Sequence, residues 1–140
     1  MAVTGAALAA VGELSSFAAQ RDREAELLLV GAEFRSAIRG FYERSPGVKR
    51  YPASLEELVE DKRHPVPERY LRRVYPDPMT GKPEWGLVEA PGGGIMGVYS
   101  LSEMVPVRTG NFSPDNESFA DGRRYSDWKF FYAPPAAAKK

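Results

Sequence analysis

The first third of the chain has the hydrophobic pattern of one long helix. Residues 20–44 are rich in helix formers, and their larger apolar side chains are separated by steps of three and four that place them near one helical face: Phe34, Ile38, Phe41 and Tyr42. All 12 prolines lie from Pro46 onward, where a Ser-Pro-Gly sequence ends the pattern. We therefore expect a helix from about residue 5 to residue 44, which at 1.5 Å per residue is roughly 60 Å long.

The rest of the chain predicts short elements joined by turns. Three segments with strand-like patterns are expected to form a small antiparallel sheet: 84–89, 94–100 and 127–132. The glycine run 92–94 provides a hairpin loop between the first two. Ser54 and Glu57 have the spacing of a capping box, which predicts a short helix over 55–61. The fold class expected is α+β, with a long N-terminal α-helix packed on a small C-terminal antiparallel sheet.

The helix is too long for the rest of the chain to cover, so one end is expected to project. Residues 1–19 are small and apolar, with Glu13 as their one charged residue, and the uninterrupted apolar part is about half of the roughly 20 residues that span a bilayer. Two interpretations stay open: the exit half of a transmembrane helix that begins upstream of Met1, or the weakly hydrophobic start of a soluble helix. We expect 1–19 to be a partial membrane span or projecting helix, 20–135 a globular domain, and 136–140 a frayed tail.

Composition excludes several functions. Nineteen basic and nineteen acidic residues give a formal net charge of zero, without the basic surplus typical of nucleic-acid binding. No cysteine is present and His64 is the one histidine, which excludes a thiolate nucleophile and a two-histidine metal site. His64 is expected at the surface, and Asp77, between two prolines, is expected to form a turn. No catalytic constellation converges, so we expect no enzymatic activity and no required cofactor.

Two short motifs are the most specific in the sequence: Asp77-Pro78-Met79-Thr80-Gly81 and Ser126-Asp127-Trp128. With segments 24–28, 34–38, 51–58, 71–76 and 97–100, the chain resembles type IV pilin-like proteins, and most closely the pseudopilins of bacterial type II secretion systems. The resemblance covers most of residues 7–132. Members of that family begin with a basic leader, a cleaved glycine and a membrane span with glutamate at its fifth mature position. Glu13 does not match that glutamate, because the apolar run fails at Ser15, so the processing site and half the span are expected upstream of Met1.

The resemblance implies assembly rather than chemistry. The chain would be a structural subunit of a pseudopilus that helps export folded proteins, anchored by a single pass in the bacterial inner membrane with its domain in the periplasm. Its partners would be other pseudopilin subunits, through the N-terminal helix, and the inner-membrane assembly platform, but not nucleic acid. The alternatives are a minor pilin of a type IV pilus and a periplasmic partner-binding module that forms no fibre. Charges in residues 21–26 would either pair between subunits or form a solvated helix face.

The candidate metal ligands lie in or beside a long polar loop over 102–126. Calcium prefers six to eight oxygen ligands. Major pseudopilins have a calcium site in their C-terminal loop region, so the resemblance implies a possible calcium site here. The candidates are Asp115, Glu117, Asp121 and Asp127. Their spacing matches no EF-hand, and Arg123 and Arg124 partly cancel their charge, so a solvated polar loop is the alternative.

Overall fold

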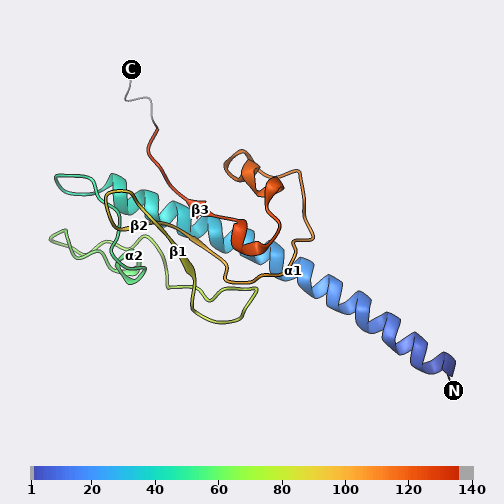
Figure 1. Cartoon of the computed structure of the whole chain (residues 1–140). Coiled ribbons are helices and arrows are strands. Elements are labelled where there is room, and N and C mark those ends of the chain that lie inside the picture. The colour runs from blue at the N-terminus through green and yellow to red at the C-terminus, as the bar shows by residue number, and fades with distance from the viewer. Residues whose placement is uncertain (1, 136–140) are drawn as a thin grey trace.

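A computed structural model describes residues 2–135, with side chains described for residues 16–135. The helices and strands, in chain order, are α1 (Ala2–Glu43), α2 (Glu56–Val59), β1 (Gly86–Glu89), β2 (Ile95–Tyr99) and β3 (Phe130–Phe131) (Figure 1). Two 3-10 helices precede β3: η1 (Pro114–Asp121) and η2 (Tyr125–Asp127). The predicted α+β arrangement of a long N-terminal helix and a three-stranded antiparallel sheet is confirmed. The tail predicted at 136–140 lies outside the described residues.

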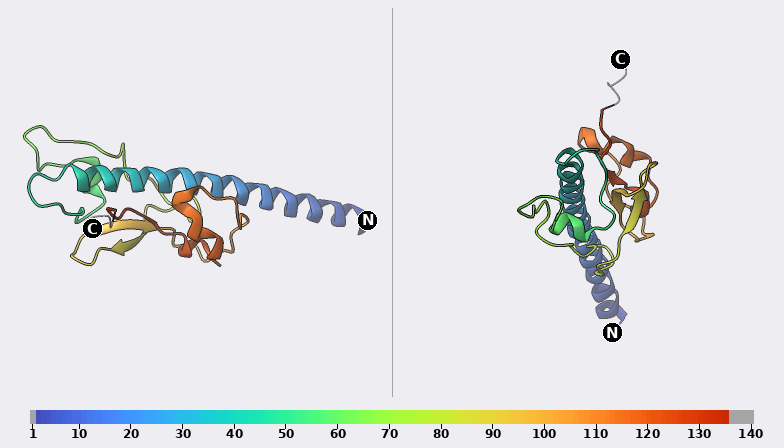
Figure 2. Two further views of the ribbon diagram at one scale, coloured as in Figure 1. Left: turned by 90° about the horizontal axis from the view of Figure 1, so that it is seen from above. Right: turned by 90° about the vertical axis from the view of Figure 1, so that its left-hand side faces the viewer.

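The long helix α1 has 42 residues and ends one turn before Pro46. Ser45, two residues after the end of the helix, donates a hydrogen bond from its Oγ to the Phe41 carbonyl at 3.2 Å. The sheet lies along the C-terminal half of α1, and the N-terminal part of the helix extends beyond the other elements (Figures 1 and 2). The helix is therefore longer than its own domain, as expected from the sequence.

The sheet has the order β1-β2-β3, and both pairs are antiparallel. Gly93 and Gly94 have positive φ angles of 103° and 87°, which allow the tight hairpin between β1 and β2. The third strand is shorter than predicted. Residues 125–127 wind into η2 because Trp128 must turn back into the core, and β3 therefore contains Phe130 and Phe131 alone.

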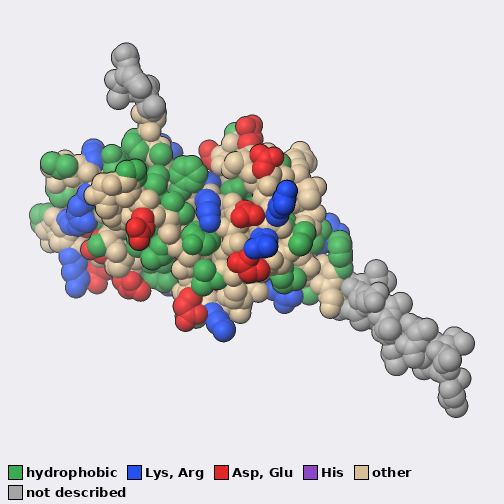
Figure 3. Space-filling model, in the orientation of Figure 1, with side chains coloured by type: hydrophobic (Ala, Val, Ile, Leu, Met, Phe, Trp, Pro, Cys, Tyr) green, Lys and Arg blue, Asp and Glu red, His purple; other side chains and the backbone are tan. Residues whose placement is uncertain are grey.

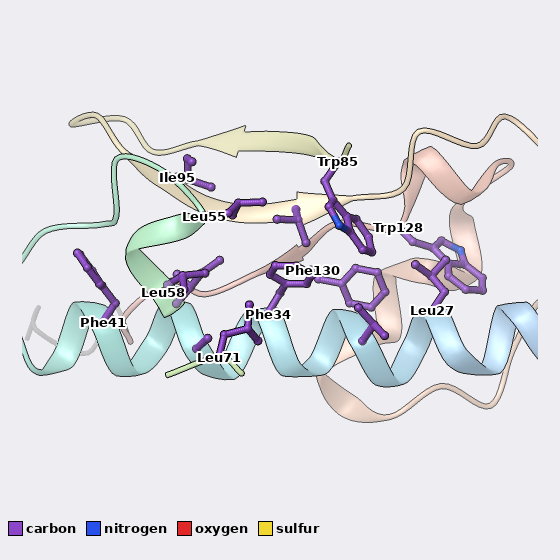
Figure 4. Packing of buried hydrophobic residues seen from close by; sticks show 14 of the residues in the cluster. Leu27, Phe34, Phe41, Leu55, Leu58, Leu71, Trp85, Ile95, Trp128 and Phe130 are labelled. Atoms are coloured by element: carbon purple, nitrogen blue, oxygen red, sulfur yellow. The ribbon is translucent and has the colours of Figure 1, made fainter. Parts of the chain in front are cut away.

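One face of α1 carries the core. Figure 4 shows Leu27, Phe34 and Phe41 rising from α1 toward the sheet and α2. Their partners come from α2, the sheet, η1, η2 and the connecting segments: Leu55, Leu58, Leu71, Trp85, Ile95, Val98, Phe119, Tyr125, Trp128 and Phe130. Gly31 lies in this face, and the Phe130 ring occupies the space that a side chain at position 31 would need. A Cβ added to Gly31 would lie only 2.3 Å from that ring. The close approach of β3 to the helix thus depends on this glycine.

The capping box predicted for α2 does not form. The Ser54 hydroxyl makes no cap hydrogen bond, and the helix covers Glu56–Val59, shorter than the predicted 55–61. Glu57 still reaches backward, but its Oε1 accepts from the Ala53 backbone N–H at 3.0 Å. The turn begins with i,i+3 bonds from Glu57 to Ser54 and from Leu58 to Leu55, at 3.3 and 3.0 Å. Because of these two 3-10-type bonds, the residue at the N-cap position is Leu55, and Ser54 lies one residue too early to act as the cap.

Candidate functional site

A buried carboxylate joins the middle of α1 to the C-terminal loop. The Glu24 side chain belongs to a residue only 5% exposed. Its Oε2 accepts hydrogen bonds from the backbone N–H groups of Val107 and Arg108, at 2.8 and 3.1 Å, and from the Tyr125 hydroxyl at 2.8 Å. One turn earlier, Gln20 donates from Nε2 to the Val105 carbonyl at 2.9 Å. The prediction of a solvated charged face is therefore wrong for Glu24, which ties the loop to the helix.

The other charged residues of that segment behave as the sequence predicts for a solvated face. Arg21, Asp22, Arg23 and Glu26 are all exposed. Helical spacing did not single out Glu24. It lies three residues before Leu27, but Arg23 lies four residues before Leu27 and Glu26 four before Val30, and both are exposed. The loop that covers this side of α1, and not the spacing along the helix, buries Glu24.

An aromatic cluster holds the loop in place beneath this anchor. Trp128 stacks on Phe119, with ring centroids 5.2 Å apart and planes 6° apart. Tyr125 and Phe112 each pack edge-on against Trp128, at 5.2 and 5.4 Å. Burial raises the pKa of Tyr125 to about 12, and the Glu24 carboxylate adds to this rise. Tyr125 therefore stays protonated at neutral pH and can donate to Glu24.

A groove of about 840 Å³ runs between α1 and the loop. Its loop side contains Val107, Phe112 and Asn116, and the apolar residues of its helix side are Phe17, Ala25, Leu28, Leu29 and Ala32. Arg21 and Arg108 add positive charge to its lining. The visible surface has acidic and basic side chains interspersed (Figure 3). The groove therefore combines an apolar wall with charges of both signs, because Glu24 also lies in its lining.

A second polar cluster closes the C-terminal end of α1. Asp61 is 1% exposed and accepts from Arg63 Nε at 2.7 Å and from the Tyr70 hydroxyl at 2.8 Å. Arg63 also donates from Nη2 to the Phe41 carbonyl at 2.8 Å, where a cation is favourable to the helix dipole. Burial alone would raise the pKa of Asp61, but the hydrogen bonds from Arg63 and Tyr70 outweigh it and hold the pKa well below 3.8. This cluster is a helix-end clamp.

His64 lies beside that clamp rather than free at the surface. Its Nε2 is 3.3 Å from Asp61 Oδ2, and the side chain is 22% exposed. The prediction of a simple surface residue is thus wrong, because the chain after α2 folds back over Asp61.

Asp77 forms a turn, as predicted, and also fastens the turn to the sheet. Its Oδ1 accepts from the Met79 backbone N–H at 2.9 Å. Its Oδ2 accepts from Ser100 Oγ at 2.8 Å and from the Leu101 N–H at 3.1 Å, directly after β2. The residue is 0% exposed, so these partners surround its carboxylate.

The predicted calcium ligands lie in the loop, but the structure gives them different surroundings. Asp115, Glu117 and Asp121 are exposed. Asp127 Oδ2 accepts from the backbone N–H groups of Arg123 and Arg124, at 2.9 and 3.1 Å, and the bond from Arg123 is the main cause that lowers its pKa. Within the described side chains, no group of three or more His, Asp or Glu residues is placed to hold a metal ion. A calcium site in this loop stays a prediction.

Comparison of the chain with family models, curated proteins and solved structures finds no significant match. Among the described residues, no helix combines the length and the apolar character needed to cross a bilayer.

Proposed function

We propose that this protein is a structural, fibre-forming subunit of the type IV pilin-like kind, similar to the pseudopilins of type II secretion. In this role it would be anchored in the bacterial inner membrane with its domain in the periplasm. It would join other subunits through the N-terminal helix, interact with the inner-membrane assembly platform, and help to export folded proteins. The proposal assigns no catalytic residue.

One observation supports this proposal most: α1 continues well beyond the domain that covers it. The buried residues of α1 among the described side chains run from Glu24 to Phe41, whereas the helix begins at Ala2. A helix that its own domain leaves uncovered can bury further surface only against another helix, another protein or lipid. The fixed attachment of the loop at Glu24 gives such a helix a rigid base.

A periplasmic binding module that forms no fibre is the second candidate. It is favoured by the groove between α1 and the loop, whose exposed apolar residues, such as Phe17 at 52%, would suit a partner peptide. A minor pilin of a surface pilus would share the anatomy of the first candidate and differ in the fibre that it joins.

Deletion of the gene in its host tests the proposal. We expect proteins that are normally exported to accumulate in the periplasm, and a plasmid copy of the gene to restore export. Electron microscopy of cells that overproduce the chain together with the secretion system should reveal fibres containing it. Normal export in the deletion strain, combined with no fibres, would contradict the proposal and favour the binding module.

A further inference from the structure

The groove between α1 and the C-terminal loop contains a side-chain amide whose oxygen the fold leaves without a partner. Asn116 lies at the kink of η1, contributes to the groove lining and is only 8% exposed. Its Oδ1 is buried and has no hydrogen-bond partner among the described residues. A buried acceptor without a donor costs folding free energy, which a bound group with an N–H would recover.

Glu24 adds a second oxygen of this kind to the lining of the groove. Its Oε2 already accepts the three hydrogen bonds described above, whereas its Oε1 accepts none from the described residues. The groove therefore contains two acceptors, one from α1 and one from η1, that a ligand with N–H donors would satisfy.

Two arginines give the groove a surplus of positive charge. Arg21 is exposed on α1, and neither Arg21 nor Arg108 takes part in an ion pair among the described residues. The Arg108 guanidinium lies over the Phe112 ring, 4.9 Å from its centroid, and donates from Nε to the Gly110 carbonyl at 3.1 Å. These contacts hold its charge beside the groove. Because Glu24 supplies one negative charge against two positive ones, the lining favours a ligand with an acidic group.

Large apolar side chains make up much of the remaining surface of the groove. Phe17 and Leu29 of α1 are 52% and 66% exposed, and Phe112 lies on the loop side. Exposed apolar surface next to a few polar groups is typical of binding sites. The volume of about 840 Å³ also lies within the range of about 300–1,000 Å³ that is common for such sites.

We propose that this groove binds an extended peptide segment of another protein, in which an acidic residue is flanked by apolar ones. The Asn116 amide pairs with a peptide group, and a further backbone N–H donates to Glu24 Oε1. The acidic side chain of the peptide pairs with Arg21 and Arg108, and its apolar neighbours cover Phe17. An acyl chain would cover the same apolar wall but has no donor along its length, whereas a peptide has an N–H at every residue other than proline.

This binding function goes beyond fibre formation, because one copy of the chain contains the complete groove and needs no neighbouring subunit. It also defines the chemistry of the partner that a binding module, the second candidate function, would require.

Selection from a phage-displayed library of random peptides, with the full chain as the target, is the first test. Enriched sequences should contain Asp or Glu with apolar residues on both sides. A fluorescein-labelled synthetic copy of the most enriched peptide then gives a Kd by fluorescence anisotropy. Enrichment of basic sequences, or no enrichment over the starting library, would overturn the inference.

Charge reversal tests where the peptide binds. Arg21→Glu should weaken binding of the enriched peptide about tenfold, because an attractive charge becomes repulsive. The same peptide with Lys in place of its acid should bind Arg21→Glu more tightly than it binds the native chain. Arg72→Glu, which is exposed and outside the groove lining, makes the same change in net charge and should keep the native affinity. Equal affinity of Arg21→Glu and the native chain would overturn the inference.

Asn116→Leu separates a role in binding from a role in folding. Leucine is similar in size to asparagine and needs no hydrogen bond, so Tm should not fall. Peptide affinity should weaken about fivefold, because the peptide loses its hydrogen bonds to the amide. A version of the peptide with N-methylated backbone groups should lose less affinity on this substitution than the unmodified peptide. A lower Tm with unchanged peptide affinity would overturn the inference.

Other occupants of the groove would give different results. Vesicles of phosphatidylethanolamine and phosphatidylglycerol that bind the native chain but not Arg21→Glu, with no enriched peptide, would indicate a lipid site and overturn the inference. Loss of export in the deletion strain without any enriched peptide would support the proposed function and overturn the inference. An enriched peptide that responds to Arg21→Glu and Asn116→Leu, with normal export and no fibres, would do the reverse.

Discussion

The fold can bury the Glu24 carboxylate because one of its oxygens, Oε2, accepts hydrogen bonds from distant parts of the chain. Two backbone N–H groups and the Tyr125 hydroxyl converge on its Oε2, so burial does not leave the charge unsolvated. The same residue that anchors the loop therefore shapes one side of the groove.

Replacing Glu24 by alanine should lower the free energy of unfolding by about 2–3 kcal/mol, because buried donors at Val107 and Tyr125 lose their acceptor. Glu24→Gln should cost less, since its amide oxygen still accepts. Urea unfolding monitored by circular dichroism measures both. Glu26→Ala, exposed on the next turn, is the matched control and should change stability by less than about 0.5 kcal/mol.

The buried Asp61 carboxylate should make the stability of the protein depend on pH in the acidic range. Its pKa is lower in the folded protein than the ordinary value of 3.8, so its ionised form favours folding. That contribution is complete above the ordinary pKa and is lost as the pH falls below it. The unfolding free energy of the native protein should therefore fall between about pH 5 and pH 2, and Asp61→Asn should show a smaller fall over that range.

At pH 7 Asp61→Asn should itself cost about 3 kcal/mol, because Arg63 loses its buried counter-charge. Glu60→Gln, the exposed neighbour, serves as the control and should keep the native pH profile. An acid profile that is identical for Asp61→Asn and the native protein would show that other carboxylates cause the acid sensitivity.

The contact between α1 and β3 depends on the absence of a side chain at Gly31. An alanine in a helix is normally more favourable than a glycine by about 1 kcal/mol. Here the Cβ would lie 2.3 Å from the fully buried Phe130 ring, so the helix and the strand would have to separate.

Gly31→Ala should therefore destabilise the protein, by about 1–3 kcal/mol, against the usual trend for this substitution. Combining it with Phe130→Leu should give less than the sum of the two separate losses, because the smaller side chain relieves the clash. Thermal and urea unfolding of the four proteins in this cycle measure the coupling. Strict additivity would show that Gly31 and Phe130 do not limit each other.

The loop before β3 also carries the calcium prediction. If calcium binds, a concentration about a hundred times the dissociation constant should stabilise the protein by about 2.7 kcal/mol and raise Tm by several degrees. Asp121→Asn should reduce the rise, whereas Glu103→Gln, outside the predicted ligand set, should not. A Tm that stays the same with calcium and with a chelator would contradict the site.

Folding and assembly are carried by different parts of the molecule. The buried residues of α1 among the described side chains lie between Glu24 and Phe41, and the helix extends far beyond them toward its N-terminus. A domain with this arrangement does not need the first turns of its helix in order to fold.

Removing residues 2–15 should therefore change the free energy of unfolding by less than about 1 kcal/mol. A loss of about 1 kcal/mol would shift the Tm of a domain of this size by more than about 2 °C, so we expect a smaller change than that. Phe34→Ala, in the core, should lower Tm far more and is the comparison that shows the assay responds. Circular dichroism melting of the purified proteins measures both. A large loss of Tm on truncation would show that the N-terminal turns belong to the folding unit.

Local pattern was sufficient for the main elements. The long proline-free stretch with apolar steps of three and four predicted α1. Alternation predicted strands where β1 and β3 form, and the glycine run predicted the hairpin that leads into β2. The turn at Asp77 also followed from its neighbours, because prolines and glycine restrict the backbone over a few residues.

Other features required contacts across the chain. Glu24 and Tyr125 are 101 positions apart, so no short-range pattern could reveal that the hydroxyl supplies the carboxylate with a donor. Asp127, the first residue of the third predicted strand, lies in η2 instead, directly before Trp128, whose stacking on Phe119 in the core outweighs strand propensity. The groove likewise exists only where the loop lies against α1. Spacing along the chain sets local backbone geometry, whereas the burial of charges and the shape of surfaces depend on which distant segments meet.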